Sequence, residues 1–137
     1  MSFYMYEKQM MNNKNNMKPV IKLMKLLRDY HNWAKLSSYY IKTIFMWEQV
    51  THGPGTMFWQ NGLGYLFMHM LGKLEGYLRG GKIPFFWDKR SNLISRLGQA
   101  EIENMCGRVK RLKRQLELAL SQPDRDMSSV MDMVFPS

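Results

Sequence analysis

The longest regular pattern in this sequence is the spacing of apolar side chains from Leu63 to Leu78. Apolar residues recur three or four positions apart, which is typical of an amphipathic α-helix. They are Leu63, Leu66, Phe67, Met70, Leu71, Leu74, Tyr77 and Leu78. Gly80–Gly81 is expected to end this helix. Glycines within and beside the pattern cost helix stability, so we expect another helix to pack closely at Gly62, Gly64, Gly72 and Gly76.

Two further segments have the same period. One runs from Val20 to Tyr30, with Pro19 in its first turn, where a missing N–H costs nothing. Its apolar face consists of Val20, Leu23, Met24, Leu27 and Tyr30. The other runs from about Gln99 to Leu120 and is stopped by Pro123. Its apolar face consists of Ile102, Met105, Cys106, Val109, Leu112, Leu116 and Leu120.

No segment alternates convincingly between apolar and polar residues, so we predict an all-α helical bundle. Lys82–Trp87 is expected to be extended and to lie across the bundle as an aromatic lid. A polar turn at Asp88–Ser91 and a short helical turn at Asn92–Leu97 should follow. With 137 residues the chain has room for one domain. We expect a flexible lead-in at 1–16, a helical lobe at 17–120 and a polar tail at 121–137.

The stretch from Leu36 to Glu48 is predicted to form the central helix. Ser37 or Ser38 can cap its N-terminus by accepting a hydrogen bond from a first-turn N–H. The start of a helix also suits a phosphate group, so a capped core helix and a phosphate-binding helix are both open interpretations. The buried stripe is expected to be Tyr40, Ile44 and Trp47, widened by Ile41 and Phe45.

The net charge of +9 and a pI near 9.8 favour polyanionic partners, although a solvated basic surface is the alternative. Part of this charge forms a strip at helical spacing: Lys18, Lys22, Lys25 and Arg28. No apolar run reaches the ~20 residues of a membrane helix, and no signal peptide is evident. The single cysteine, Cys106, is expected to be buried and inert and fits a reducing compartment. We therefore expect a cytoplasmic protein without a membrane partner.

The sequence offers little for a metal ion. Its three histidines, His31, His52 and His69, lie in separate segments, and there is no cysteine pair, so zinc is not expected. His69 is expected to be a hydrogen-bonded structural residue. The glutamates are interpreted as scattered charges, with no pair placed to hold Mg²⁺: Glu48, Glu75, Glu101 and Glu103.

Several motifs point to a known family. Ser37-Ser-Tyr-Tyr-Ile-Lys-Thr43 is followed by an apolar run and Trp47–Glu48. Three later blocks follow in matching order and spacing: Trp59-Gln-Asn-Gly-Leu-Gly-Tyr65, Leu78-Arg-Gly-Gly-Lys-Ile-Pro-Phe-Phe86 and Ser91-Asn-Leu-Ile94. From about Lys18 to Leu97 the chain resembles the C-terminal helical lobe of the Mab-twenty-one nucleotidyltransferases. This family includes the cyclic GMP-AMP synthases and the insect synthase-like receptors, and the Trp47–Glu48 ending looks most like the insect receptors.

The resemblance implies roles for five residues. Lys25 and Ser38 match residues that contact nucleotide phosphates, and Tyr39 matches a tyrosine that stacks on a base. Lys18 and Lys22 match basic positions that meet the activating double-stranded nucleic acid. The chain lacks the Cys/His zinc insertion of the DNA-sensing members, which leaves double-stranded RNA, or no nucleic acid, as the expectation. Tyr39 is expected to face a cleft near Ser38 and Lys25.

The implied function is the nucleotide- and nucleic-acid-binding half of an innate immune receptor that makes a cyclic dinucleotide from nucleoside triphosphates such as ATP and GTP. The Gly-Ser motif and the acidic triad for Mg²⁺ belong to the family's N-terminal nucleotidyltransferase lobe and are not found in this sequence. The chain alone is thus expected to hold no cofactor and to catalyse nothing, whether it is a fragment, a truncated gene model or a natural short protein. One alternative is a non-catalytic Mab-family adaptor that binds nucleic acid or a protein partner through a basic face. A basic helical domain without a ligand is another.

Overall fold

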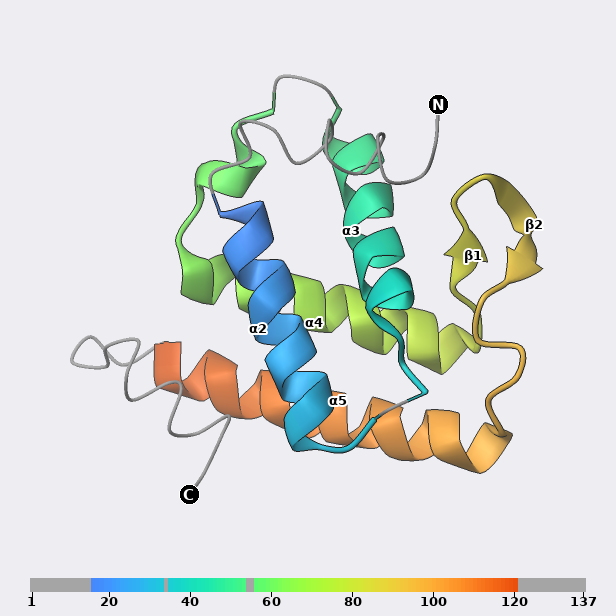
Figure 1. Ribbon diagram of the computed structural model, residues 1–137. Coiled ribbons are helices and arrows are strands. Elements are labelled where there is room, and N and C mark those ends of the chain that lie inside the picture. Colours follow the sequence, from blue (N-terminus) through green and yellow to red (C-terminus); the bar gives the residue numbers. More distant parts are fainter. Residues whose placement is uncertain (1–15, 34, 54–55, 121–137) are drawn as a thin grey trace.

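The computed structural model describes residues 16–33, 35–53 and 56–120. Its elements are α2 (Met17–Tyr30), α3 (Ser38–His52), the short 3₁₀ helix η1 (Phe58–Gln60), α4 (Leu63–Gly80), β1 (Pro84–Phe85), β2 (Asp88–Asn92) and α5 (Gln99–Leu120). Helices α2 and α3 lie side by side across α4, and α5 packs along α4 (Figure 1). The fold is therefore mostly helical, as predicted, with one small hairpin. The predicted lead-in and tail lie almost wholly outside the described residues.

The helix ends follow the sequence signals. Ser37 is the N-cap of α3, and its hydroxyl accepts a hydrogen bond from the Tyr40 N–H at 3.3 Å. Helix α4 ends at Gly81, whose φ of 70° lies in the left-handed region that glycine adopts without a Cβ clash. The expected close packing holds at Gly72, where an added Cβ would lie 3.3 Å from Lys113 Nζ on α5. It does not hold at Gly62 or Gly76, where an added Cβ would meet nothing within 4 Å.

The core lies where the helices meet. Its buried side chains include Val20, Met24, Leu27, Ile41, Ile44, Phe45, Leu66, Phe67, Met70, Leu74, Met105, Val109, Leu112 and Leu116. Trp59, which is 1% exposed, anchors η1 in this core: its ring stacks on Phe45 at 5.8 Å. Its indole N–H donates to Gln49 Oε1 at 2.6 Å, which satisfies the one polar group of the buried ring.

Some predicted core residues are placed differently. Tyr30 is 45% exposed at the last residue of α2, where its ring lies against His31. Tyr40 and Cys106 are only partly buried, at the edge of the core. Trp47 is also partly buried, and it faces the hairpin: its indole N–H donates to the Pro84 carbonyl at 2.9 Å and its ring packs beside Phe86 at 5.0 Å. The side chain of Leu120 lies outside the described residues.

The segment after α4 folds back over α3 as an aromatic hairpin. Of the segment predicted as an extended lid across the bundle, only Pro84–Phe85 forms a strand, and the hairpin lies beside α3, where it contacts Trp47. The polar turn predicted at Asp88–Ser91 is wrong, because these residues belong to β2, the strand that pairs with β1. The helical turn predicted at Asn92–Leu97 is also wrong. There the Asn92 side chain accepts from the N–H groups of Ile83 and Ile94, both at 3.0 Å, and holds the backbone in turns.

Among the described residues, no helix is both long enough and apolar enough to cross a membrane.

Candidate functional site

The start of α3 is joined to α2 by one arginine. Arg28 Nη1 donates to Ser38 Oγ at 2.9 Å and to the Leu36 carbonyl at 3.4 Å. Its Nε pairs with Asp29 Oδ1 at 2.9 Å, and its side chain is 17% exposed. A guanidinium group therefore lies at the N-terminal end of a helix, beside a serine hydroxyl. The sequence placed Arg28 only in the basic strip, since its contact with Ser38 depends on how α2 and α3 pack.

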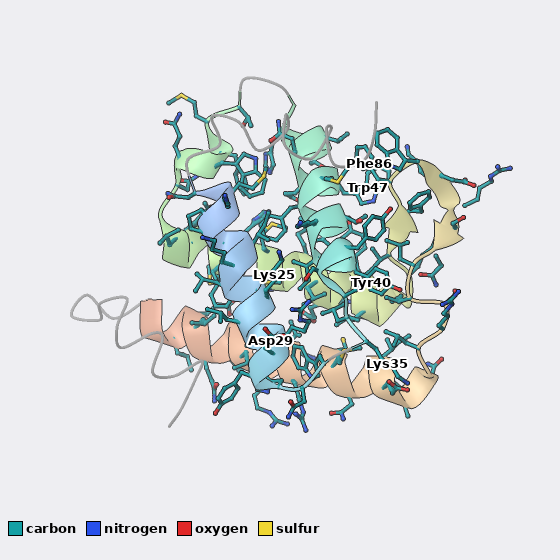
Figure 2. All side chains as sticks on the ribbon, in the orientation of Figure 1. Lys25, Asp29, Lys35, Tyr40, Trp47 and Phe86 are labelled. Carbon is teal, nitrogen blue, oxygen red and sulfur yellow. The ribbon has the colours of Figure 1, made fainter. Side chains whose placement is uncertain are left out.

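Lys25 shares the Arg28 side of α2. The two residues are three positions apart, so their side chains leave the helix on neighbouring positions about 4.5 Å apart along the axis. Lys25 is half-buried on α2, which runs beside α3 (Figure 2). Arg28 therefore lies at the first turn of α3, and Lys25 lies about one turn earlier on α2; a shared site for Lys25 and Ser38 stays a prediction.

Tyr39 lies in the first turn of α3, and its ring is beside the hairpin. Its ring is 6.3 Å from that of Phe85 and 6.4 Å from that of Tyr40, and the side chain is partly buried. Burial raises the pKa of the Tyr39 hydroxyl above its ordinary value. Tyr40, by contrast, packs against the core. Tyr39 is thus partly exposed at the side of the core, and its stacking on a base remains a prediction.

The predicted basic strip divides into two parts. Lys18 and Lys22 are exposed on the first turns of α2, whereas Lys25 and Arg28 are partly buried in its second half. Helix α5 presents a second group of exposed cations, which consists of Arg108, Lys110, Arg111 and Arg114. Two separate basic surfaces are therefore candidates for a polyanion: the N-terminal half of α2 and the outer face of α5.

A cluster that the sequence did not predict surrounds Glu48. This glutamate is buried, with a side chain 4% exposed, and its Oε1 lies 2.9 Å from His52 Nε2 and 2.8 Å from His69 Nε2. Lys73 Nζ lies 3.6 Å from Oε2. Burial acts to raise the pKa of the Glu48 carboxyl, but the hydrogen bonds from both histidines and the charge of Lys73 outweigh it and lower that pKa.

The sequence interpretation of this cluster was correct in one part and wrong in another. His69 is hydrogen-bonded, as expected. Glu48 is not a scattered surface charge, because it points between α3 and α4 rather than into solvent. The spacing of Glu48 and His52, four residues on one helix, could have suggested that pair. Nothing in the sequence pattern placed His69 beside them.

A hollow of about 760 Å³ lies away from these residues. It opens between the end of α4 and the start of α5, where Leu78, Asn92, Ile102 and Cys106 are among its lining residues. Lys25, Ser38 and Tyr39 are not part of its wall. The predicted nucleotide-binding residues therefore belong to α2 and α3 and do not line this hollow.

Comparison with known proteins agrees with this arrangement of helices. Residues 16–111 match the Mab-21 protein HhH/H2TH-like domain. The chain is 32% identical over 124 residues to a cyclic GMP-AMP synthase-like receptor of Aethina tumida, covering 90% of this chain and 31% of the relative. It is 37% identical over 125 residues to the receptor of Ctenocephalides felis, covering 90% of this chain and 28% of the relative. It is 38% identical over 104 residues to cyclic GMP-AMP synthase-like receptor 1 of Drosophila melanogaster, covering 73% of this chain and 27% of the relative.

The chain thus spans between 27% and 31% of the length of these three relatives. The domain match itself covers most of the described residues, including all of α2, α3 and α4 and the first half of α5. This protein therefore belongs to the Mab-21 family through its C-terminal HhH/H2TH-like domain, and its relatives are insect cyclic GMP-AMP synthase-like receptors.

Proposed function

We propose that this chain forms the helical, nucleotide-binding wall of a cyclic GMP-AMP synthase-like receptor, which works together with a nucleotidyltransferase lobe. The observation that carries the proposal is the contact of Arg28 with Ser38 at the start of α3, with Lys25 one turn earlier on α2. Two cations, a hydroxyl and a helix N-terminus are the groups that bind a nucleoside triphosphate through its phosphates.

Each residue has a distinct part in this proposal. Lys25 supplies a point charge to a phosphate oxygen, and the Ser38 hydroxyl donates to another once Arg28 occupies its acceptor side. Arg28 keeps Ser38 oriented and adds its own charge to the site. Tyr39, partly exposed beside Phe85, offers a ring face to the base. The resemblance places the Mg²⁺ ligands in the other lobe, so the residues of this chain bind and orient the substrate.

Mutation of the phosphate-binding pair tests this proposal. Titration of ATP and GTP into the ¹⁵N-labelled chain should shift the amide signals of Lys25, Ser38 and Tyr39. Lys25→Ala and Ser38→Ala should each weaken affinity by about tenfold to a hundredfold, because a hydrogen bond to a charged group contributes about 1.5–3 kcal/mol. Matched controls are Lys82→Ala and Ser95→Ala, which alter exposed residues that belong to neither α2 nor α3. Affinity that falls equally in the controls, or in none of the variants, would contradict the site.

We also propose that the exposed lysines of α2 bind double-stranded RNA through its phosphates. Lys18 and Lys22 lie one turn apart, about 6 Å along the helix axis, which is close to the spacing of successive phosphates. Such contacts carry little sequence preference and weaken with salt. The relatives' name alone does not distinguish this surface from the cations of α5.

A charge-matched pair of variants makes that distinction. Lys18→Glu/Lys22→Glu should weaken binding of a double-stranded RNA. It should also reduce the slope of log affinity against log salt concentration by about 1.5–2 in magnitude, which corresponds to two lost phosphate contacts. Lys110→Glu/Arg114→Glu changes the net charge equally, at the same spacing on α5, and should do less. The opposite order would move the interface to α5. RNA binding without any nucleotide binding would favour the non-catalytic adaptor.

A further inference from the structure

We propose that Glu48, His52 and His69 form a binding site for a transition-metal dication, with Zn²⁺ as the preferred ion, and that the ion links α3 to α4. Each residue offers one ligand atom, and the three atoms lie within 4.8 Å of one another. Two imidazole nitrogens and a carboxylate oxygen are ligands that zinc accepts, with water in the fourth position. This inference is independent of the nucleotide- and RNA-binding proposals.

The distances suit an ion after a small adjustment. In a tetrahedral site with metal–ligand bonds of about 2.0–2.2 Å, neighbouring ligand atoms lie about 3.3 Å apart. Glu48 Oε1 now lies 2.9 Å from His52 Nε2 and 2.8 Å from His69 Nε2. Binding therefore requires Glu48 Oε1 to move about half an ångström away from each histidine nitrogen, and the two histidine nitrogens, which lie within 4.8 Å of each other, to take the same spacing. Rotation of the side chains can supply these shifts.

The two imidazoles are held in place by aromatic neighbours. The ring of His52 stacks on Phe58 with centroids 3.9 Å apart and an interplanar angle of 11°. His69 meets the same phenyl ring at 4.9 Å, edge to face, and stacks on Tyr65 at 6.3 Å. Both rings already direct Nε2 toward the carboxylate. Because the rings are already oriented, ion binding costs less side-chain conformational entropy.

The site also has an approach from solvent. The Glu48 side chain is 4% exposed, whereas those of His52 and His69 are 28% and 26% exposed. An ion can therefore enter past the histidines and keep a water molecule on the open side. The buried carboxylate provides charge that bulk water screens only weakly.

Protons and Lys73 compete with the ion. Without metal, each Nε2 can donate its hydrogen to Glu48, so both histidines must present a lone pair there before they can bind zinc. Lys73 Nζ lies 3.6 Å from Oε2 and repels a dication, but this side chain is 43% exposed and can turn into solvent. The geometry therefore points to a site that becomes stronger when Lys73 loses its charge.

Zinc chloride alone, added to untagged protein, tests the proposal by calorimetry and by thermal melting against an EDTA-treated sample. We expect one ion per chain, a rise in Tm and, with Co²⁺, visible absorption bands typical of tetrahedral coordination. His69→Gln keeps a donor for Glu48 but removes a metal ligand, and should weaken binding at least tenfold. His31→Gln removes a histidine outside the cluster and should leave binding unchanged.

Lys73→Met provides a second, opposite test. It should tighten zinc binding, because it removes a positive charge that lies 3.6 Å from Glu48 Oε2. If the three residues only form hydrogen bonds and bind no ion, Lys73→Met should not change the affinity for zinc. The proposal is overturned if the wild-type chain gives no saturable heat with Zn²⁺. It is also overturned if His69→Gln binds as well as wild type, or if Lys73→Met binds more weakly. ATP and RNA titrations of the same His69→Gln protein keep this result separate from the proposed function.

Discussion

Neighbouring tyrosines at the start of α3 should respond very differently to truncation. Tyr40 packs against the core, so Tyr40→Ala should cost about 2 kcal/mol, roughly half the loss for a fully buried aromatic ring. Tyr39 lies beside Phe85 on the hairpin, and Tyr39→Ala should lose its ring contacts with Phe85 and Tyr40, about 1 kcal/mol in all. Both variants gain the same helix propensity from alanine, so this gain cancels in the comparison.

Urea unfolding followed by far-ultraviolet circular dichroism would give the two free energies of unfolding. ATP titration of the same proteins adds the functional comparison. Loss of base stacking at Tyr39 should weaken affinity by about 1–3 kcal/mol, from fivefold to more than a hundredfold, whereas Tyr40→Ala should leave it nearly unchanged. Tyr39→Phe keeps the ring and should retain most of the affinity. The reasoning is refuted if Tyr39→Ala destabilises as much as Tyr40→Ala, or if only the Tyr40 variant loses nucleotide affinity.

Three other predictions concern stability and activity. Trp59→Ala should lower the free energy of unfolding by about 3–5 kcal/mol, since the ring is 1% exposed, and a loss below about 1 kcal/mol in urea unfolding would contradict its place in the core. Gly76→Ala should raise the free energy of unfolding by up to about 1 kcal/mol, because alanine favours the helix and nothing lies within 4 Å of the added Cβ. Gly81→Ala should lower it by about 1–2 kcal/mol, because a residue with a Cβ is strained at a φ of 70°. Thermal melts that rank these two variants the other way would refute the backbone argument. The isolated chain should form no cyclic dinucleotide from ATP and GTP with Mg²⁺ and double-stranded RNA, and product above a boiled-protein control would disprove this.

The sequence by itself determined the main helices and the family. The apolar period predicted α2, α4 and α5 nearly to their ends, because a helical face repeats within one segment and needs no partner to be recognised. The sequence offered Ser37 or Ser38 as the N-cap and Gly80–Gly81 as the helix end, since capping depends on residues within a turn of the helix end, and the structure uses Ser37 and Gly81. The motif from Ser37 to Thr43 pointed to the family that the comparison then identified.

Only the tertiary structure decided which polar side chains meet. The crossing of α3 and α4 brings His69 to Glu48, 21 residues away along the chain, and the packing of α2 on α3 brings Arg28 to Ser38. The hairpin could not be predicted from the sequence pattern either, because β1 has two residues, too few to show alternation. Its hydrogen bond from Trp47 to the Pro84 carbonyl depends on how the hairpin packs against α3. Periodicity records which face of an element is apolar, but the position of a hydrogen-bond partner on another element depends on crossing angle and register, which no local pattern contains.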